Sequence, residues 1–455
     1  MPTLSDRLDS SMIDPVPGSR SASLFQRARR VFPDGTSRVT IERNPTPRYI
    51  AGGEGPYLTD ADGARFLDLN ANFTTLIHGH AFAPVISAVE RQLRSGSCFA
   101  SPTEAEIALG TLLCERVPRL ERIRFVNTGT EAVMFAIKAA RAFTGRSAIA
   151  KIEGAYHGAY DWVEVAQASS PDNWGRADAP ASVPYYRGMP ASVLDETIVL
   201  RLNDADGAIK LLERNAHRLA TIVIDPMPSR AGLVTPEPAF ISALQETARS
   251  LGVLIVCDEV LNFRQGYHGA ASRCGLEPDL FALGKIIGGG FPIGAVGGRA
   301  DVMAVFDAGH GRPLLPQGGT FSANPISMVA GCAAMEALDQ AAFARLDELG
   351  ATLRAELEGA ITRSGAPFSV TGAASLFRIH PKPSPPKEFR EACWNTMEAQ
   401  TMGSMSRFFL RHGIILPDAA ACLSTPMGAA EIDKIVRVFE AFLAELNGRN
   451  SDGGA

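Results

Sequence analysis

Apolar and polar positions follow two different rhythms along this chain, and the rhythm changes near residue 84. From there on, segments with apolar residues three and four positions apart alternate with short continuous apolar runs. The first kind includes PVISAVERQLRSG, EAVMFAIKAARAFTG and AFISALQETARSLG, and the second includes AIAKIEG, TIVIDP and VLIVCDEV. Helices that alternate with buried strands predict a mainly parallel β-sheet covered by helices on both faces.

Regions outside this alternation have other patterns. Residues 46–70 are typical of short strands separated by glycine turns, whereas the last third of the chain is predicted to be mostly helical. The stretch 165–195 is rich in Pro, Ala and Ser and predicts a long loop of the kind that is functional or disordered. The proline-rich stretch HPKPSPPKEF at 380–389 predicts a surface excursion.

Composition and charge exclude several classes of protein. The net charge is −5 and no block of lysine and arginine is present, which argues against a nucleic-acid partner. The longest apolar runs, such as 252–257, are too short to span a membrane, and the first residues lack a signal-peptide core. The seven cysteines include no CxxC pair, so neither a disulfide framework nor a metal site is predicted. We therefore expect a cytoplasmic protein with reduced thiols.

Unusual residues stand at the ends of three predicted strands, the edge at which open α/β sheets bind ligands. Asp258 and Glu259 follow one apolar run, where an acid either meets a ligand or caps a turn. Residues 127–130 (NTGT) join a strand to a helix, so they either cradle a phosphate or provide only an N-cap. Lys285 lies in LGKIIGGG, where it either supplies an amine or snorkels out of the strand end.

Taken together, the three strand ends fit one chemistry. A lysine in a dry pocket has a lowered pKa and can form a Schiff base with an aldehyde. Pyridoxal phosphate requires such a lysine, a cradle for its phosphate, and an acid that keeps its pyridine nitrogen protonated. The sequence thus predicts a pyridoxal phosphate site in which Lys285 holds the cofactor and Asp258 pairs with its ring.

Several motifs carry a family resemblance over nearly the whole chain, from about residue 33 to residue 446. They are FVNTGTEA (125–132), YHG (156–158), DEV (258–260), LGKIIGGGFPIGAVGGRADVM (283–303) and GGTFSANP (318–325). With them the chain resembles the class III aminotransferases of the fold-type I pyridoxal phosphate family. Within that family it looks most like the branch of glutamate-1-semialdehyde 2,1-aminomutase and the β-phenylalanine aminotransferases.

The resemblance implies an α/β fold in two parts. A large domain, with a mainly parallel seven-stranded sheet covered by helices, is expected to bind the cofactor, and a smaller α+β domain is expected to combine the two ends of the chain. The expected boundaries are 1–78 for the N-terminal segment of the small domain, 79–325 for the large domain and 326–455 for the C-terminal small domain.

The resemblance also implies roles for individual residues. Lys285 is expected to hold the cofactor and then to shuttle the proton, with Asp258 at the ring nitrogen and Tyr156 stacked on the ring. Further cofactor contacts are expected from Thr128, Gly129 and Thr130 at the phosphate, His157 beside Tyr156, Val260 on the opposite ring face, and Thr320 at the phosphate of the neighbouring subunit. A homodimer with active sites shared between subunits is therefore expected.

Two arginines are expected to meet the substrate. Arg38, in GTSRV, matches the position at which this branch places an arginine for the substrate carboxylate; the less favoured alternative is one more surface arginine. The residue that usually bonds the phenolic oxygen of the cofactor is a Gln or Asn in the stretch IDPMPSRAG, where this chain has Pro228 and Arg230. Arg230 is expected either to take over that contact or to bind a substrate carboxylate.

The chain departs from the family pattern at two further positions. Asp225 and Pro226 stand where Glu-Pro is usual, and Asp418 lies in the stretch in which β-phenylalanine aminotransferases carry an arginine. The second departure puts the usual dicarboxylate acceptor in doubt, or moves its binding to Arg230. The aminomutases differ in the same stretch by a longer loop.

The expected activity is transfer of an amino group from a carboxylate-bearing donor, β-amino acids included, to a keto acid or aldehyde. The main alternative is an isomerase similar to glutamate-1-semialdehyde 2,1-aminomutase, which returns the amine to the neighbouring carbon of one substrate. A non-catalytic protein on the same fold is the other alternative, against which the intact Lys285 and Asp258 argue. A requirement for a separate keto acceptor distinguishes the transferase from the isomerase.

Overall fold

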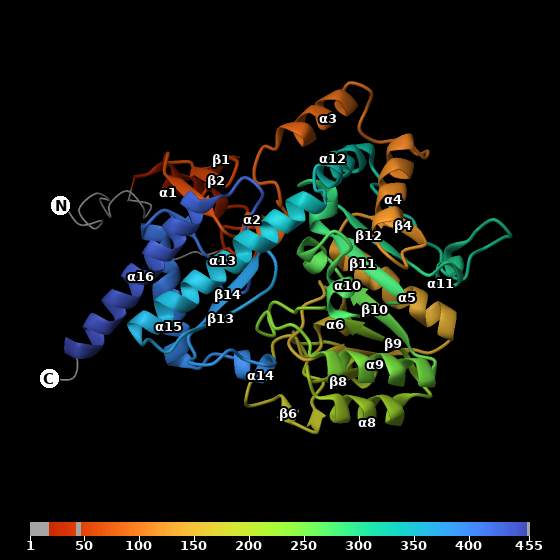
Figure 1. Cartoon of the computed structure of the whole chain (residues 1–455). Coiled ribbons are helices and arrows are strands. Elements are labelled where there is room, and N and C mark those ends of the chain that lie inside the picture. The colour runs from red at the N-terminus through yellow and green to blue at the C-terminus, as the bar shows by residue number, and fades with distance from the viewer. Residues whose placement is uncertain (1–17, 42–46, 453–455) are drawn as a thin grey trace.

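A seven-stranded sheet forms the centre of the larger part of the molecule (Figure 1). The computed structural model describes residues 18–41 and 47–452. The strands from β8 to β11 pair in parallel, whereas β12 runs antiparallel to both of its neighbours, so the predicted mainly parallel sheet is confirmed. The order across the sheet is β4 (Arg122–Val126), β12 (Gly294–Gly298), β11 (Leu280–Gly284), β10 (Leu254–Asp258), β9 (Leu219–Ile224), β5 (Ala148–Ile152) and β8 (Thr197–Leu200).

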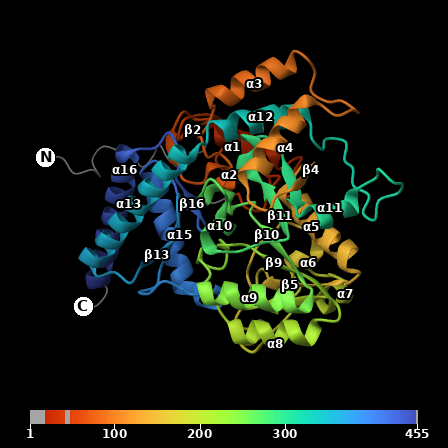
Figure 2. The same ribbon diagram turned by 45° about the vertical axis from the view of Figure 1, so that its right-hand side comes forward.

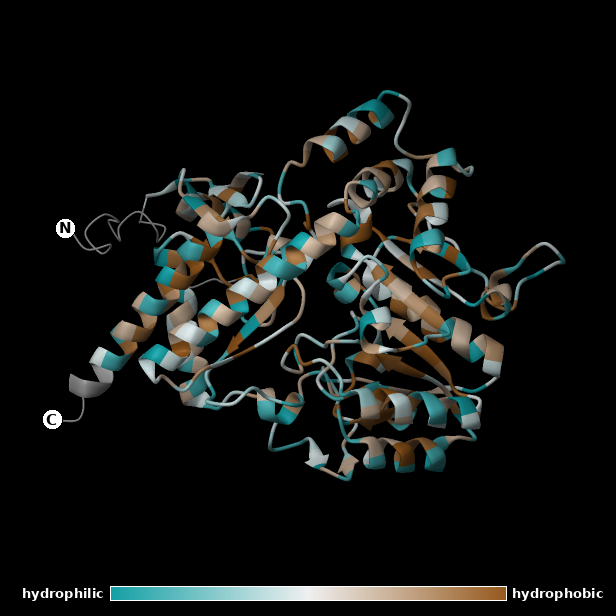
Figure 3. Ribbon diagram, viewed as in Figure 1, coloured by the Kyte–Doolittle hydropathy of each residue, from teal (hydrophilic) through white to brown (hydrophobic). Residues whose placement is uncertain are grey.

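Both faces of this sheet are buried, which explains the continuous apolar runs in the sequence. In β10, Leu254 and Val256 pack into one apolar cluster, and Ile255 and Cys257 pack into another on the opposite face. Helix α5 (Gly129–Thr144) covers the first face, and α8 (Ala205–Asn215) and α9 (Pro238–Leu251) help to cover the second. Figure 3 shows the strands as the most apolar part of this region.

Segments from the N-terminal and C-terminal portions of the described chain together form a smaller α+β part (Figures 1 and 2). Strand β15, near the C-terminus, pairs in parallel with β3, near the N-terminus, so one sheet combines both segments. The order in that sheet is β1 (Ile50–Glu54), β2 (Tyr57–Asp60), β3 (Arg65–Asp68) and β15 (Ile414–Ile415), and the order in a neighbouring sheet is β13 (Ser369–Thr371), β14 (Leu376–His380) and β16 (Ala421–Cys422). The boundaries 1–78, 79–325 and 326–455 stay predictions.

Long helices complete the smaller part, and a second group of helices lies beside the edge of the large sheet. The former are α13 (Gln340–Ser364), α15 (Thr396–Arg411) and α16 (Ala429–Asp452), and the latter are α3 (Ala83–Leu93), α4 (Glu104–Arg116) and α12 (Pro325–Glu336). The short elements are α1 (Arg20–Ala28), α2 (Ala71–Thr74), α6 (Asp161–Glu164), β6 (Gly175–Arg176), β7 (Ala179–Pro180), α7 (Ala191–Asp195), α10 (Ala270–Cys274), α11 (Ala300–Met303), α14 (Phe389–Ala392), and the 3-10 turns η3 (Asn262–Gln265), η4 (Lys285–Gly288) and η5 (Ala304–Phe306). In the part of the chain that the structure describes, no helix combines the length and the apolar character needed to cross a bilayer.

The proline-rich stretch at 380–389 is only in part the predicted surface excursion, because residues 383–385 are exposed whereas the end of the stretch packs against the large sheet. Its later part is buried, with Glu388 and Phe389 both 6% exposed. The proline run prevents a regular helix before α14, but it does not prevent packing. Glu388 forms an ion pair with Arg201 at 3.2 Å, and the Phe389 ring lies directly against Gly154, at the end of β5.

Candidate active site

Three polar side chains meet at the carboxyl edge of the large sheet because of the strand register. Ile224 pairs with Cys257 across β9 and β10, which places Asp225 and Asp258 side by side as both strands end. Lys285 follows β11, the next strand in the sheet. An open α/β sheet binds ligands at this edge, and both acids are buried there.

Asp258 is held by donors on both of its oxygens. His157 Nδ1 lies 2.7 Å from Oδ2, and the backbone N–H of Val260 donates to Oδ1 at 3.0 Å. Burial lowers the pKa of His157, while Asp258 acts in the opposite direction. Because Nδ1 faces a carboxylate, the imidazole is fixed in orientation and can in turn orient Asp258.

Lys285 combines a strained backbone with an unusual amine. Its φ of +50° is left-handed, which costs energy in a residue with a Cβ and is common at functional sites. Burial lowers the pKa of Lys285 to about 8, with Asp258 and Asp225 opposing the shift. The side chain nevertheless keeps partial exposure. Protein therefore surrounds the amine, although the residue as a whole is not fully buried.

The turn before α5 lies beside these residues. A Cβ on Gly129 would lie 2.6 Å from Cγ1 of Val260, so only glycine permits this approach. Thr128 caps the helix by accepting from the N–H of Glu131 at 3.0 Å, and Thr130 Oγ1 accepts from the N–H of Ala159 at 3.2 Å. The N-terminus of this 16-residue helix therefore points its positive end toward Val260 and the strand ends.

Tyr156 and Arg230 stack on one another near the strand ends. The Arg230 guanidinium lies 4.8 Å from the centre of the Tyr156 ring, and Tyr156 is 46% exposed. Burial raises the pKa of Tyr156, and Arg230 opposes that shift. Among the causes of the shift is Asp258, which places the phenol near the carboxyl edge of the sheet.

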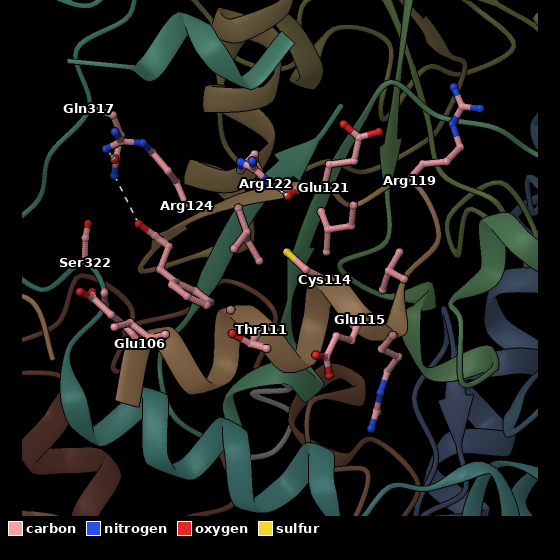
Figure 4. A pocket seen from close by; sticks show the side chains of 18 of the residues that line it. Glu106, Thr111, Cys114, Glu115, Arg119, Glu121, Arg122, Arg124, Gln317 and Ser322 are labelled. Carbon is pink, nitrogen blue, oxygen red and sulfur yellow. Dashed lines mark hydrogen bonds between the residues drawn. The ribbon is translucent and has the colours of Figure 1, made fainter. Parts of the chain in front are cut away.

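The structure does not bring Arg38 or Thr320 into direct contact with Lys285. Arg38 is exposed and donates to Asn72 Oδ1 at 3.2 Å, with its guanidinium 6.0 Å from the ring centre of Phe73. Thr320 is exposed in the segment 317–323. That segment borders a groove of about 1060 Å³ between α4 and β4 (Figure 4), and the groove contains neither Lys285 nor Asp258.

Two further residues near the site were not identified from the sequence. Asn262 is fully buried and donates to Asp225 Oδ1 and, at 3.3 Å, to the carbonyl of Met227. Arg264 is also fully buried and donates to the Thr74 carbonyl at 2.9 Å. Its other acceptors are the Leu423 carbonyl at 2.5 Å and Ser375 Oγ at 3.1 Å. Both residues follow the DEV motif, and that proximity is the one hint the sequence offered.

Arg264 fixes a backbone segment that the sequence also did not reveal. Four consecutive residues of α2, from Ala71 to Thr74, have positive φ between 47° and 71°. Left-handed runs of this kind are costly for residues other than glycine. The turn persists because Asn70 accepts from the N–H of Phe73 and Arg264 binds the Thr74 carbonyl, and it presents Asn72 and Phe73 beside Arg38.

The residues present fit pyridoxal phosphate. The site offers a helix N-terminus for a phosphate, a buried carboxylate for a ring nitrogen, and a lysine whose amine is readily neutral. The buried Nε2 of His157 has no hydrogen-bond partner within the described ranges, so the pair leaves a polar atom for a further group. This set can bind an aldehyde cofactor and move a proton beside it.

Comparison with known proteins agrees with this chemistry. A model of the family described as aminotransferase class-III matches residues 40–403. Glutamate-1-semialdehyde 2,1-aminomutase of Methanothermobacter thermautotrophicus is 35% identical over 433 residues, which cover 94% of this chain and 99% of that protein. An omega-transaminase from Sphaerobacter thermophilus is 49% identical with a TM-score of 0.92, covering 94% of this chain and 98% of its own. A β-phenylalanine aminotransferase from Variovorax paradoxus is 32% identical with a TM-score of 0.82, covering 94% of each chain. The chain therefore belongs to the class III aminotransferases, a family of pyridoxal phosphate-dependent enzymes with the fold-type I architecture.

Proposed function

We propose that this enzyme is a transaminase that takes its amino group from a carboxylate-bearing donor, β-amino acids included, and passes it to a keto acid or aldehyde. One observation carries the amine chemistry of this proposal, which an isomerase would share. Lys285, with a pKa lowered to about 8, lies at the same sheet edge as the Asp258–His157 pair. A candidate general base and a carboxylate for the cofactor ring are therefore close together. Bound pyridoxal phosphate supplies an aldehyde and an electron-accepting ring.

In this proposal the protein residues divide the work. The Lys285 amine would hold the cofactor and, once free, would accept the proton from the substrate carbon as a general base. Asp258 would keep the ring nitrogen protonated, and His157 orients that carboxylate through the 2.7 Å contact. Thr128, Gly129 and Thr130 would hold the phosphate, and Tyr156 and Val260 would pack against the ring.

Arg38 and Arg230 are the proposed receptors of substrate carboxylate. A guanidinium binds a carboxylate through two parallel hydrogen bonds, which fixes the orientation of the donor. Arg38 is held near the strained turn by Asn72, and Arg230 lies over Tyr156. Asp418, which accepts from Ser406 Oγ at 3.0 Å, also acts electrostatically on Arg378, and a carboxylate there disfavours a second acidic group of the substrate.

We also propose that two copies of the chain share their active sites. Ile107, which lines the groove of Figure 4, is 65% exposed, and Phe321, which directly precedes the lining residue Ser322, is 56% exposed; exposed apolar side chains of this kind mark protein contacts. Thr320 is exposed and stands in the sequence between the lining residue Gly319 and Phe321. A second copy that covers the groove would receive Thr320 at the phosphate of its own site.

A complementation experiment tests this arrangement. Lys285→Ala and Thr320→Ala subunits, each impaired alone, are mixed after partial denaturation and refolded together. Shared sites predict recovery of activity in mixed dimers, because one of the two sites then has both residues. Absence of recovery, with dimers present by sedimentation, would show that each chain builds its own site.

An isomerase is the second candidate function because of one observation. The similarity to glutamate-1-semialdehyde 2,1-aminomutase covers 94% of this chain. An aminomutase would use the same Lys285 and Asp258, but it would return the amine to the neighbouring carbon of one substrate.

The visible absorbance of the purified protein, followed while single amines are added, separates the candidates. Loss of the yellow band with a β-amino acid, and its return only with a keto acid, supports the transaminase. Rearrangement of glutamate-1-semialdehyde without any keto acid would instead support the isomerase. Absence of the band after addition of pyridoxal phosphate would contradict both and favour a non-catalytic protein.

A further inference from the structure

A short segment of the C-terminal part reaches back to the large sheet and ends beside the proposed substrate site. This segment, residues 386–392, is called the strap here; it contains α14, which Figure 1 shows between the two parts of the molecule. Pro386, Phe389 and Ala392 are buried, although the strap follows a proline-rich stretch and is short. The strap is therefore held by specific contacts rather than by regular secondary structure.

Arg390 makes most of the polar contacts of the strap. Its Nε donates to Glu153 Oε2 at 2.7 Å, and its Nη2 donates to Glu153 Oε1 at 3.1 Å, which forms a two-bond ion pair. The same guanidinium donates to the carbonyls of Trp174 at 2.9 Å and Gly175 at 3.0 Å, and lies 5.0 Å from the Trp174 ring centre. Arg390 thus joins the strap to the end of β5 and to the loop at 165–190.

The apolar residues of the strap fit against two glycines. A Cβ on Gly154 would lie 2.0 Å from the Phe389 ring, so a side chain there would displace the strap. A Cβ on Gly232 would lie 3.0 Å from Cβ of Ala392. Gly154 stands two residues before Tyr156, and Gly232 stands two residues after Arg230. The strap therefore touches both backbone segments that bring this stacked pair together.

The Arg230 segment is held by the C-terminal part in a second way. Thr371 Oγ1 donates to the Gly232 carbonyl at 2.7 Å, and Arg378 Nη1 donates to the Ser229 carbonyl at 2.9 Å. On the other side, Lys151 donates to the Ala155 carbonyl at 3.0 Å and fixes the residue before Tyr156. The C-terminal part thus fixes the backbone on both sides of Arg230. The strap, which also packs against Gly154, connects this segment to the one that carries Tyr156.

We propose that Arg390 is a positioning residue that, through Glu153 and the strap, holds Tyr156 and Arg230 in register for the substrate carboxylate. The proposal rests on the proposed function for its substrate class. Glu153 is 0% exposed, so removal of Arg390 leaves a buried carboxylate without its partner. Such a group either draws in water or takes up a proton, and both responses loosen the end of β5.

The test compares Arg390→Met with Arg390→Lys, Glu153→Gln and the variant that combines Glu153→Gln with Arg390→Met. Arg363→Met is the matched control, because Arg363 forms a 2.6 Å ion pair with Glu440 on the exposed surface of the same C-terminal part. KM and kcat are measured with a β-amino acid and with a simple arylalkyl amine that lacks a carboxylate. Visible circular dichroism of the bound cofactor reports its surroundings without turnover, and thermal unfolding reports folding.

We expect Arg390→Met to raise KM for the β-amino acid by about tenfold, with a much smaller change for the amine and for kcat. The cofactor dichroism should change as well, and Arg390→Lys should restore part of both effects. The double variant should be less impaired than the sum of its single changes, because neither of the two positions then carries a charge that has lost its partner. Arg363→Met should behave as the unchanged protein.

Other results would overturn the proposal. Equal losses with both substrates, or an unchanged cofactor spectrum in a folded Arg390→Met protein, would mean that the strap serves stability alone. If Arg390→Met does not fold, the same comparison is made with Glu153→Gln. Failure of the proposed function looks different, because the unaltered enzyme would then turn over neither substrate, while the dichroism comparison would still decide the role of Arg390.

Discussion

The lowered pKa of Lys285 predicts an unusual dependence of its reactivity on pH. A free lysine of pKa about 10.5 is about 0.03% neutral at pH 7, whereas an amine of pKa about 8 is about 9% neutral, a difference of about 300-fold. Only the neutral amine attacks an aldehyde. The apoprotein should therefore form its adduct with pyridoxal, the analogue without a phosphate, far faster than N-acetyl-lysine does near neutral pH.

The assay traps the adduct by borohydride reduction and counts it on the Lys285 peptide by mass spectrometry. The rate should rise up to about pH 8 and then level off, whereas N-acetyl-lysine should become about tenfold faster per pH unit until near pH 10. Asp258→Asn removes a carboxylate that raises the pKa of Lys285, so its plateau should begin at lower pH. A rate that keeps rising to pH 10 in parallel with N-acetyl-lysine would refute the reasoning.

Three substitutions test the remaining assignments. Lys285→Ala should abolish turnover while the unfolding temperature stays close to that of the unaltered protein, and measurable turnover would remove Lys285 from its proposed role. Arg38→Ala should raise KM for carboxylate donors far more than for simple amines, and equal effects on the two would show that it does not bind the carboxylate. Arg264→Met should lower the free energy of unfolding by several kcal/mol, since each of its three buried acceptors loses a donor at a cost of about 1–3 kcal/mol; a change below about 1 kcal/mol in urea unfolding would show that water replaces the guanidinium.

The large sheet was predictable because its signals are local. A few neighbouring residues are enough to recognise an apolar run that becomes a buried strand, or a helix between two such runs. The motifs alone indicate that Asp258 and Lys285 stand at strand ends. The register of β9 against β10 was not visible, because it depends on packing along the whole sheet. As a result, Asp225 was noted as a departure from the family but not as a neighbour of Asp258.

Residues that join distant segments were not predictable for the same reason. Arg264 donates to the carbonyl of Thr74 in the N-terminal turn, to the carbonyl of Leu423, which follows β16, and to Ser375 Oγ. The residues next to Arg264 in the sequence give no indication of these distant partners. The first four residues of the strap, 386–389, lie in the proline-rich stretch that was predicted to be a surface excursion. Its burial depends on Glu153 and Gly154, which lie more than two hundred residues earlier in the chain.

Two lysines show that burial alone does not identify a reactive amine. Lys151 in AIAKIEG and Lys285 in LGKIIGGG both stand in apolar runs, and burial lowers the pKa of both, to about 7 and about 8. Lys151, however, is 0% exposed and donates to two carbonyls, at 3.0 and 2.8 Å, so its amine is committed to holding the Tyr156 segment. Lys285 instead keeps partial exposure at an open strand end, on a strained residue facing two carboxylates. A lowered pKa therefore shows only that a lysine is buried, whereas exposure and neighbouring acids identify a lysine that can react. The pyridoxal experiment should accordingly label Lys285 and leave Lys151 unmodified.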